Sequence, residues 1–371
     1  MSAEPETGGR SPVVVVTGAS AGIGRAIAVA FAGAGFDVGL LARGRAGLDG
    51  AAAEVEQRGR RALALPCDVA DHAQVARAAE RAEAELGPID VWVNNAMTTA
   101  FAPSWELRPE DFQRAVEVTF LGQVWGTLVA LEHFRPRDRG TIVDVGSALS
   151  FLGIPLQSAY CSSKFACRGF FESVRAELLH EGSNVVMSMV HPPAVNTPQF
   201  SWCLSQMGHH PQPVPPIYQP EVVAASVLAA ARDGRRSTVV GSWNRVVVAA
   251  GKYTPGLGNH FASLGAWESQ LTDRPTGDDR PANLRRPADE DEDFGAHGVF
   301  DDASGGFWDP SYLRSLPSTA ATMARAGWRT GTEKLRWVRR RFAGPGRHLA
   351  PSGTAGRGRP RRDGSVGTDR R

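Results

Sequence analysis

The sequence predicts an α/β domain with a doubly wound parallel sheet. Short β-branched runs alternate with helical patterns over about 240 residues, and this alternation is typical of parallel strands joined by crossover helices. The first run, residues 13–16, is continuously apolar, as expected of a strand buried on both faces. Apolar residues make up 42 % of the 371 residues, which is enough for one large packed core.

The expected elements follow one another along the chain. Strands are predicted at residues 13–16, 38–42, 62–69, 91–95, 141–147, 184–191 and 237–241. Helices are predicted at residues 25–31, 73–86, 110–134, 157–181 and 221–233, with a further helical pattern between the second and third strands. This order places helices on both faces of the sheet, so residues 12–253 are expected to form one Rossmann domain.

The chain outside this domain is expected to differ in kind. Residues 1–11 contain no apolar stretch and residues 343–371 are rich in Gly, Pro and Arg, so both ends are expected to be disordered. Residues 254–317 carry Pro, Gly and charge, including the acidic run 289–293, and yet hold several aromatic side chains. These are Phe294, Phe300, Phe307, Trp308 and Tyr312. They predict an irregular extension that packs against the main domain.

Residues 318–342 contain an apolar stripe at helical spacing. Its members are Ala324, Trp328, Gly331, Leu335, Val338 and Phe342. Most of the neighbouring arginines lie off the stripe, and a basic amphipathic helix of this kind can lie on the surface of an anionic membrane. Two other interpretations remain open: the stripe docks on the protein's own surface, or the segment is solvated and disordered.

The charge and cysteine patterns exclude several classes of protein. Residues 334–371 hold twelve Lys or Arg against two acids, a local net charge of +10, so the rest of the chain carries −8 within the overall +2. An acidic body is not typical of a nucleic-acid-binding fold. The four cysteines have no metal-ligand spacing, so we expect no metal site and free thiols in a reducing compartment. With no signal-peptide pattern and no run of about 18 apolar residues, the sequence predicts a cytoplasmic protein.

A glycine-rich turn joins the first predicted strand to the first predicted helix. In the segment TGASAGIG, residues 17–24, Gly18 permits a tight turn, Gly22 lets the backbone approach a pyrophosphate, and Gly24 lets the helix pack on the strand. The helix N-terminus then offers free N–H groups and a partial positive charge to phosphates. A dinucleotide site is therefore predicted here, with Ser20 and Ile23 among its contacts.

The end of the second predicted strand indicates which dinucleotide is bound. NAD-selective sites place an acid there to bind the ribose 2′-hydroxyl. This sequence has Arg43, and a guanidinium pairs well with a 2′-phosphate. We therefore predict NADP(H) over NAD(H), the alternative being that Arg43 merely opens the next helix. Asp68 and Val69, which close the third strand, are expected beside the adenine, unless Asp68 only caps the helix that follows.

Tyr160 and Lys164 are four residues apart on a predicted helix. This spacing puts the phenol and the ammonium group on one face, and a neighbouring cation lowers the pKa of a phenol from its usual value of about 10. Ser147 lies 13 residues before Tyr160, at the carboxyl end of a strand, where open α/β sheets bind their ligands. Its hydroxyl can hydrogen-bond a substrate oxygen, so the three residues predict a proton-transfer site.

Together these segments resemble the short-chain dehydrogenase/reductase family over roughly residues 11–250. The matching segments are TGASAGIG, CDV at 67–69, NNA at 94–96, Ser147, YCSSK at 160–164 and residues 192–197. The resemblance implies that Tyr160 is the catalytic acid/base, that Lys164 lowers its pKa and holds the nicotinamide ribose, and that Ser147 orients the carbonyl.

The same resemblance implies further cofactor contacts. It assigns Asn94 the support of the strand beside the cofactor, and it places Thr197 at the nicotinamide end. Ala96, Pro192 and Val195 belong to the matching segments and are expected to line the cofactor site.

Three positions depart from the family's pattern. Thr119 stands where members usually have an Asn that supports a proton relay, so we expect Thr119 to take part in catalysis through a rearranged relay. Met97 replaces the usual Gly after NNA and should narrow the pocket. Pro193 replaces the Gly of the usual Pro-Gly pair and should stiffen the loop beneath the nicotinamide.

The expected function is NADP(H)-dependent interconversion of a carbonyl and an alcohol. Apolar residues in the long loop 199–218 and after Ser147 favour a lipophilic small-molecule substrate, unless they only pack the loop onto the protein. Non-redox chemistry on the same fold, such as dehydration or epimerisation, and an NADP(H)-binding sensor without turnover are the alternatives. A homo-oligomer, dimer or tetramer, is also expected.

Overall fold

A computed structural model describes residues 10–277 and 280–305 of the chain. Most of the predicted N-terminal segment, the stripe at 318–342 and the tail from residue 343 lie outside these ranges. All described residues belong to one compact unit.

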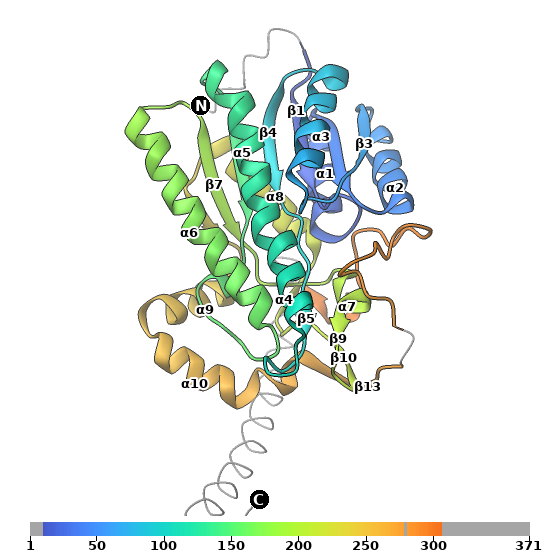
Figure 1. Ribbon diagram of the computed structural model, residues 1–371, viewed down its shortest axis with the longest axis vertical. Helices are drawn as coiled ribbons and strands as arrows, with labels where there is room; N and C mark the ends of the chain where they lie inside the picture. Colours follow the sequence, from blue (N-terminus) through green and yellow to red (C-terminus); the bar gives the residue numbers. More distant parts are fainter. Residues whose placement is uncertain (1–9, 278–279, 306–371) are drawn as a thin grey trace, which may run out of the picture. The chain divides into compact units, whose positions relative to one another are not determined.

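A seven-stranded parallel sheet forms the centre of the described unit (Figure 1). In chain order its strands are β1 (Val13–Thr17), β2 (Asp37–Ala42), β3 (Ala62–Pro66), β4 (Ile89–Asn94), β6 (Thr141–Val145), β7 (Val186–His191) and β12 (Ser237–Val239). Their order across the sheet is β12-β7-β6-β4-β1-β2-β3, so the direction of winding reverses between β1 and β4. The predicted doubly wound Rossmann arrangement is confirmed.

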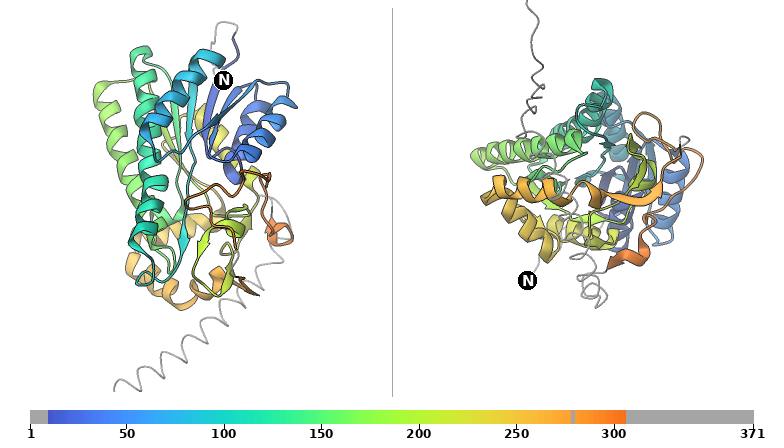
Figure 2. Two further views of the ribbon diagram at one scale, coloured as in Figure 1. Left: turned by 45° about the vertical axis from the view of Figure 1, so that its right-hand side comes forward. Right: turned by 90° about the horizontal axis from the view of Figure 1, so that it is seen from below.

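Helices cover both faces of this sheet (Figure 2). One layer holds α1 (Gly22–Gly33), α2 (Arg45–Glu56) and α8 (Pro220–Asp233), and the other holds α3 (His72–Leu86), α5 (Gly122–Phe134) and α6 (Ser158–Glu181). Alternate residues of β1 contribute to the two cores: Val14 and Val16 pack with the first layer, Val13 and Val15 with the second. Burial on both faces explains why the strands are continuous apolar runs.

The helix predicted at 110–134 contains a wider turn. It begins as α4 (Pro109–Val116), passes through a π-helical turn at Glu117–Leu121 and continues as α5. Within the turn, the Thr119 hydroxyl donates to the carbonyl oxygen of Thr98 at 2.7 Å and accepts the N–H of Thr98 at 3.0 Å. The widened turn is thereby bound to the loop that follows β4.

Regular structure continues where the sequence predicts none. A pair of helices, α9 (Ser242–Tyr253) and α10 (Pro255–Gly265), follows β12, and β10 (His209–Pro211) pairs antiparallel with β13 (Leu271–Pro275). The expectation of an irregular segment from residue 254 is therefore wrong for residues 255–265 and 271–275. Several glycines hide the helical pattern of α10, whereas its proline stands at the first position, where no N–H is needed.

Short elements complete the described part of the chain. They are β5 (Ala100–Phe101), β8 (Ala194–Val195), α7 (Gln199–Trp202), β9 (Leu204–Ser205), β11 (Ile217–Tyr218) and β14 (Ser304–Gly305). In the three-stranded sheet β14-β11-β8, the extension pairs with the loop region after β7. None of the helices within the described ranges is both long and apolar enough to cross a membrane.

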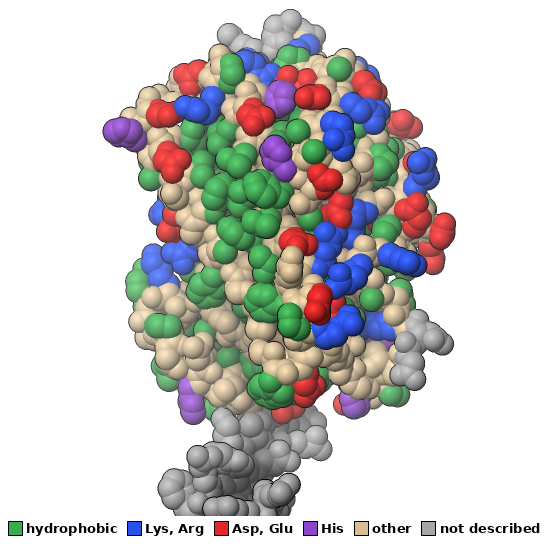
Figure 3. All heavy atoms as spheres, viewed as in Figure 1, with side chains coloured by type: hydrophobic (Ala, Val, Ile, Leu, Met, Phe, Trp, Pro, Cys, Tyr) green, Lys and Arg blue, Asp and Glu red, His purple; other side chains and the backbone are tan. Residues whose placement is uncertain are grey.

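Hydrophobic side chains gather on the outer face of α5 (Figure 3). Leu128 on α5 and Phe165 on α6 are large apolar side chains that are 38 % and 45 % exposed. Exposed apolar side chains that cluster in this way are typical of surfaces that bind another protein.

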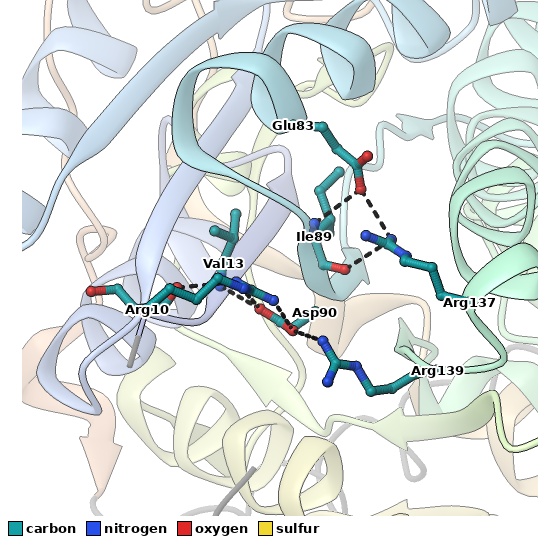
Figure 4. Close-up of polar contacts among 8 residues, drawn as sticks. Arg10, Val13, Glu83, Ile89, Asp90, Arg137 and Arg139 are labelled. Atoms are coloured by element: carbon teal, nitrogen blue, oxygen red, sulfur yellow. Dashed lines mark hydrogen bonds and ion pairs between the residues drawn. The ribbon is translucent and has the colours of Figure 1, made fainter. Parts of the chain in front are cut away.

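A polar cluster ties together the amino ends of β1 and β4, at the edge of the sheet opposite the strands' carboxyl ends (Figure 4). Asp90 pairs with Arg10 at 2.7 Å and accepts the N–H of Val13 at 2.9 Å. Glu83 accepts the N–H of the first residue of β4 at 3.0 Å and pairs with Arg137 at 3.0 Å. Asp90 thereby joins the amino ends of the two strands, and Glu83 and Arg137 hold the start of β4.

Asp37, the first residue of β2, is a buried carboxylate held by two arginines. It accepts hydrogen bonds from Arg60 at 2.6 Å and from the side chain and backbone of Arg61 at 2.8 and 3.1 Å. Burial raises the pKa of Asp37, but the hydrogen bonds from Arg61 and Arg60 outweigh it, so the pKa lies below its ordinary value. The stabilisation is therefore complete above the ordinary carboxyl pKa of about 3.9 and is lost as the pH falls below it.

Asp37→Asn is expected to lower the free energy of unfolding by about 2–3 kcal/mol at pH 7, the scale of lost hydrogen bonds to charged groups. The difference from the wild type should shrink as the pH falls below about 4, because the carboxylate of the unfolded wild type is protonated there and the folded one follows at its lower pKa. Urea unfolding at both pH values measures it. Glu85→Gln breaks an exposed pair with Arg81 and should cost about 0.5 kcal/mol or less. Equal losses in the two variants would contradict the structural role of Asp37.

Candidate active site

The turn between β1 and α1 has the geometry that its glycines predict. Gly18 and Gly22 have φ values of +66° and +59°, a backbone conformation that residues other than glycine rarely adopt. A Cβ atom on Gly24 would lie 2.0 Å from the carbonyl oxygen of Gly18. The first turn of α1 therefore approaches the end of β1 too closely for any side chain at position 24.

The loop after β4 is bound to this turn. The Thr17 hydroxyl accepts the N–H groups of Asn95 at 2.9 Å and Ala96 at 3.0 Å. In return, Nδ2 of Asn95 donates to the carbonyl oxygens of Thr17 at 3.0 Å and Gly18 at 3.3 Å. Because β1 and β4 are neighbours where the strand order reverses, these bonds build the crevice in which open α/β sheets bind ligands.

Asn94, the predicted supporting residue, is buried in a separate network. Its Nδ2 donates to Thr127 at 3.0 Å and to Asp144 at 2.9 Å, and its Oδ1 accepts the indole N–H of Trp92 at 2.8 Å. The bond to Asp144 joins β4 to β6. Of the two adjacent asparagines, it is Asn95, and not the predicted Asn94, that lines a cleft at the carboxyl ends of the strands. The alternation of side chains along an extended strand separates the two, but the NNA motif alone does not say which faces the cleft.

A cleft runs along the carboxyl ends of β1, β2, β3 and β4. It brings together most of the predicted cofactor residues. Among the residues that line it are Gly18, Ser20, Gly22, Ile23, Arg43, Asp68, Val69, Ala96 and Thr197. Gly24 lies behind the turn, where it permits the close packing. The N-terminus of α1 opens onto this cleft, and such a terminus suits the phosphates of a dinucleotide.

A second cavity adjoins the cleft and is lined by the predicted catalytic residues Ser147, Tyr160 and Lys164. The predicted residues Pro192 and Val195 line it as well, together with Pro193. Several apolar side chains complete its wall; they include Leu149, Leu152, Ile154, Phe200, Trp243 and Val247. The two spaces meet at Ile23, Asn95, Met97, Thr197 and Gln199, which line both.

Tyr160 and Lys164 lie one turn apart on α6. The Lys164 Nζ atom is 5.8 Å from the centre of the Tyr160 ring and donates to the carbonyl oxygen of Val145 at 2.7 Å. Burial lowers the pKa of Lys164. Burial also raises the pKa of Tyr160, against the opposing hydrogen bond with Ser147. This direction is opposite to the one predicted from the neighbouring cation, because desolvation of the phenolate is the larger effect.

Ser147 is held in place from both sides. Its Oγ accepts the N–H of Leu149 at 3.0 Å, and its carbonyl oxygen lies 3.2 Å from Nδ1 of His191. The buried His191 ring packs edge-on against Phe151, with centroids 4.8 Å apart. Burial lowers the pKa of His191 to about 4, so the imidazole is neutral near pH 7. His191, the last residue of β7, is therefore a packed side chain that supports the backbone of Ser147.

Thr119 does not occupy the position that the sequence analysis expects. Its side chain is fully buried, and its one hydroxyl proton is already donated to the carbonyl oxygen of Thr98. Among the described residues, those that line the cleft and the cavity do not include it. The prediction that this hydroxyl takes part in catalysis is therefore wrong. Thr119 has a structural role instead: it holds the loop that carries Met97 against the π-helical turn.

Residues 280–305 cross the cleft at the ends of β2 and β3. Arg43 donates to the side chain of Asn283 at 2.9 Å and to its carbonyl oxygen at 2.5 Å. Asp68 pairs with Arg114 and accepts the N–H of Ala70 at 3.1 Å, whereas the cap of α3 is a different aspartate, Asp71. Asn283 and Asp289 also line the cleft. No local pattern marks these two residues, since their partners lie some 240 positions earlier in the sequence.

Comparison with known proteins shows which family this chain belongs to. The model of the short chain dehydrogenase family matches residues 12–205. An uncharacterized oxidoreductase of Bacillus subtilis (strain 168), YxnA, is 34 % identical over 269 residues, which is 72 % of this chain and 76 % of the relative. This chain belongs to the short chain dehydrogenase family. The 3-ketodihydrosphingosine reductase of Bos taurus is 30 % identical over 242 residues, which is 62 % of this chain and 71 % of that protein.

A solved structure agrees with this family. The alcohol dehydrogenase of the archaeon Thermococcus sibiricus, complexed with 5-hydroxy-NADP, is 28 % identical to this chain with a TM-score of 0.54. The match covers 94 % of that chain but 62 % of this one, so this short chain dehydrogenase has a long part without a counterpart there. The protein is an oxidoreductase with an NAD(P)-binding Rossmann fold.

Gly24→Ala tests whether this short chain dehydrogenase depends on the close approach at the glycine turn. The added Cβ meets the Gly18 carbonyl at 2.0 Å, so α1 must shift, and cofactor affinity should fall about tenfold or more. Gly169→Ala is the control: it adds the same atom in α6 with nothing within 4 Å, and should preserve affinity and gain up to about 1 kcal/mol of helix stability. Cofactor titration and thermal melting measure both. Unchanged affinity in the Gly24 variant would contradict the model of a sterically fixed turn.

Proposed function

We propose that this enzyme interconverts a carbonyl and an alcohol on a lipophilic small molecule, with NADP(H) as the hydride carrier. The observation that carries the proposal is the junction of two spaces: the cleft at the glycine turn opens into the cavity that contains Ser147, Tyr160 and Lys164. A nicotinamide dinucleotide fits this site because the N-terminus of α1, the glycine turn and Thr197 line one continuous path. When bound, the nicotinamide supplies or accepts the hydride.

The residues of the cavity divide the remaining work. Ser147 would position the substrate oxygen, and Tyr160 would give it a proton in reduction or take one in oxidation. The raised pKa of Tyr160 keeps the phenol protonated near neutral pH, which is the form that carbonyl reduction needs. Lys164, fixed to the carbonyl oxygen of Val145, would hold the nicotinamide ribose and stabilise charge that develops on the phenol.

The walls of the cavity support a lipophilic substrate. Leucine, isoleucine, valine, phenylalanine and tryptophan side chains from several separate segments line it around Ser147, Tyr160 and Lys164. Pockets of this composition, with a few convergent polar groups, bind apolar small molecules and orient them through the polar groups. A relative of this chain is named for reduction of a keto group, in 3-ketodihydrosphingosine.

Two finer assignments belong to the same proposal. The preference for NADP(H) is supported by Arg43 in the cleft and by the absence of an acid at the end of β2, and the solved relative carries an NADP derivative. Assembly as a dimer or tetramer is supported by the exposed apolar side chains of α5 and α6.

Tyr160→Phe keeps the ring and removes the proton that the reaction transfers. We expect kcat to fall about 10²-fold or more, while the dissociation constant of NADPH changes little. The assay follows NADPH absorbance against a panel of lipophilic ketones and aldehydes. Tyr253→Phe, at a tyrosine that is 72 % exposed, is the matched control and should keep wild-type turnover. Undiminished turnover of the Tyr160 variant would refute the mechanism.

Arg43→Ala should weaken NADPH binding by about 1–3 kcal/mol, the scale of hydrogen bonds to a charged group, and leave NADH binding nearly unchanged. Isothermal titration with both cofactors measures the difference. Arg58→Ala removes the same charge from an exposed position after α2 and should affect neither cofactor. An equal loss for NADPH and NADH would mean that Arg43 only supports the fold through Asn283.

A further inference from the structure

Residues 283–295, here called the strap, carry a run of acids across the cofactor cleft. The strap lies outside residues 12–205, the part of the chain that the family model matches. Asn283 and Asp289 of the strap line the cleft beside Arg43 and Ser20. The cofactor site is therefore built in part by a segment far along the chain.

The strap is bound to the Rossmann domain on both sides of the cleft. Asp293 forms two hydrogen bonds with Arg25, at 2.8 and 3.0 Å, and the Arg25 side chain is buried. The carbonyl oxygen of Gly295 accepts the N–H of Gly22 at 3.1 Å. At the other end, Arg285 pairs with the fully buried Asp111 at 3.0 Å.

Asp289 occupies a defined place between the glycine turn and the start of α2. It is 4 % exposed, and its carbonyl oxygen accepts the N–H of Gly47 at 3.1 Å. A Cβ atom on Gly44 would lie 2.0 Å from Oδ1 of Asp289, and one on Gly47 would lie 2.6 Å from Oδ2. The same Cβ on Gly47 would lie 2.8 Å from the Cβ of Ser20. The carboxylate thus fits against two glycines, next to Ser20.

A carboxylate in this place has opposite effects on the two cofactors. NAD-selective sites hold an acid at the end of the second strand, where it accepts a hydrogen bond from the ribose 2′-hydroxyl. Here that strand end carries Arg43, and the strap brings an acid to the same region. A carboxylate repels a 2′-phosphate, which carries up to two negative charges. Asp68 and, more weakly, Asp289 also attract the Arg43 guanidinium that would bind the phosphate.

We propose that Asp289 is a specificity-determining residue of the cofactor site, which weakens binding of the 2′-phosphate and so narrows the preference for NADP(H) that Arg43 gives. The inference rests on the proposed function only in placing the dinucleotide in this cleft. Cofactor selectivity in this enzyme is then the balance between Arg43, directly after β2, and an aspartate from the strap.

The test is Asp289→Asn in the full-length chain, with dissociation constants of NADPH and NADH measured by titration calorimetry. NADPH should bind about tenfold more tightly, because one repelling charge is removed. NADH should change by about twofold or less, since the amide oxygen still accepts a hydrogen bond from the 2′-hydroxyl. Asp291→Asn removes the same charge from an exposed strap position and should shift either cofactor by about twofold or less.

The outcomes separate this inference from its alternatives. Equal shifts for NADPH and NADH, no shift, or the same gain in the Asp291 variant would overturn it. Asp289→Ser, which removes the same charge in a smaller side chain, should reproduce the selectivity change if Asp289→Asn lowers the melting temperature. If the protein reduces no carbonyl compound but Asp289→Asn still changes the cofactor selectivity, the proposed function is wrong and this inference stands.

Discussion

The whole site depends on the close approach of α1 to the end of β1. Because position 24 has no room for a side chain, the first turn of α1 begins directly above the strand and the N-terminus of the helix opens onto the cleft. The same turn binds the loop after β4 through Thr17 and Asn95. Cleft and cavity meet at Asn95, so this packing determines where the cleft joins the cavity that Ser147, Tyr160 and Lys164 line.

Burial governs the charges of the catalytic cavity. It lowers the pKa of Lys164 and raises the pKa of Tyr160, and it raises the pKa of the neighbouring Asp144 to about 7, against a hydrogen bond from Asn94 and the charge of Lys164. All three shifts favour neutral groups, because a charge loses its hydration in this place. Burial thus favours the protonated phenol of Tyr160, and any charge that forms in this cavity depends on the fixed polar groups around it for stabilisation.

Local pattern was sufficient for the sheet, the glycine turn and the Tyr160–Lys164 pair, since each depends on residues close together in the sequence. Local pattern was not sufficient where the position of a side chain depends on contacts with residues far away in the sequence. The hydroxyl of Thr119 is bound by Thr98, which a motif position cannot reveal, and only the fold tells Asn95 from Asn94. The helix α10 was missed because its glycines obscure the period. The position of the strap across the cleft was not predicted, because Arg25 and Arg43, which bind it there, lie more than 200 residues earlier.

Because the strap lies beside Arg43, the residue at the end of β2 does not determine cofactor preference alone. If a bound 2′-phosphate displaced the strap, Asp293 would lose two hydrogen bonds to Arg25, each worth about 1.5–3 kcal/mol as a bond between charged groups. Arg285 and Asp111 would lose their pair as well. A 2′-phosphate that gains Arg43 as its partner recovers about 1.5–3 kcal/mol per hydrogen bond, and Arg43 must first release Asn283. Displacement therefore breaks more contacts between charged groups than this one arginine replaces, so we expect Asp289 to stay in the cleft when a cofactor binds.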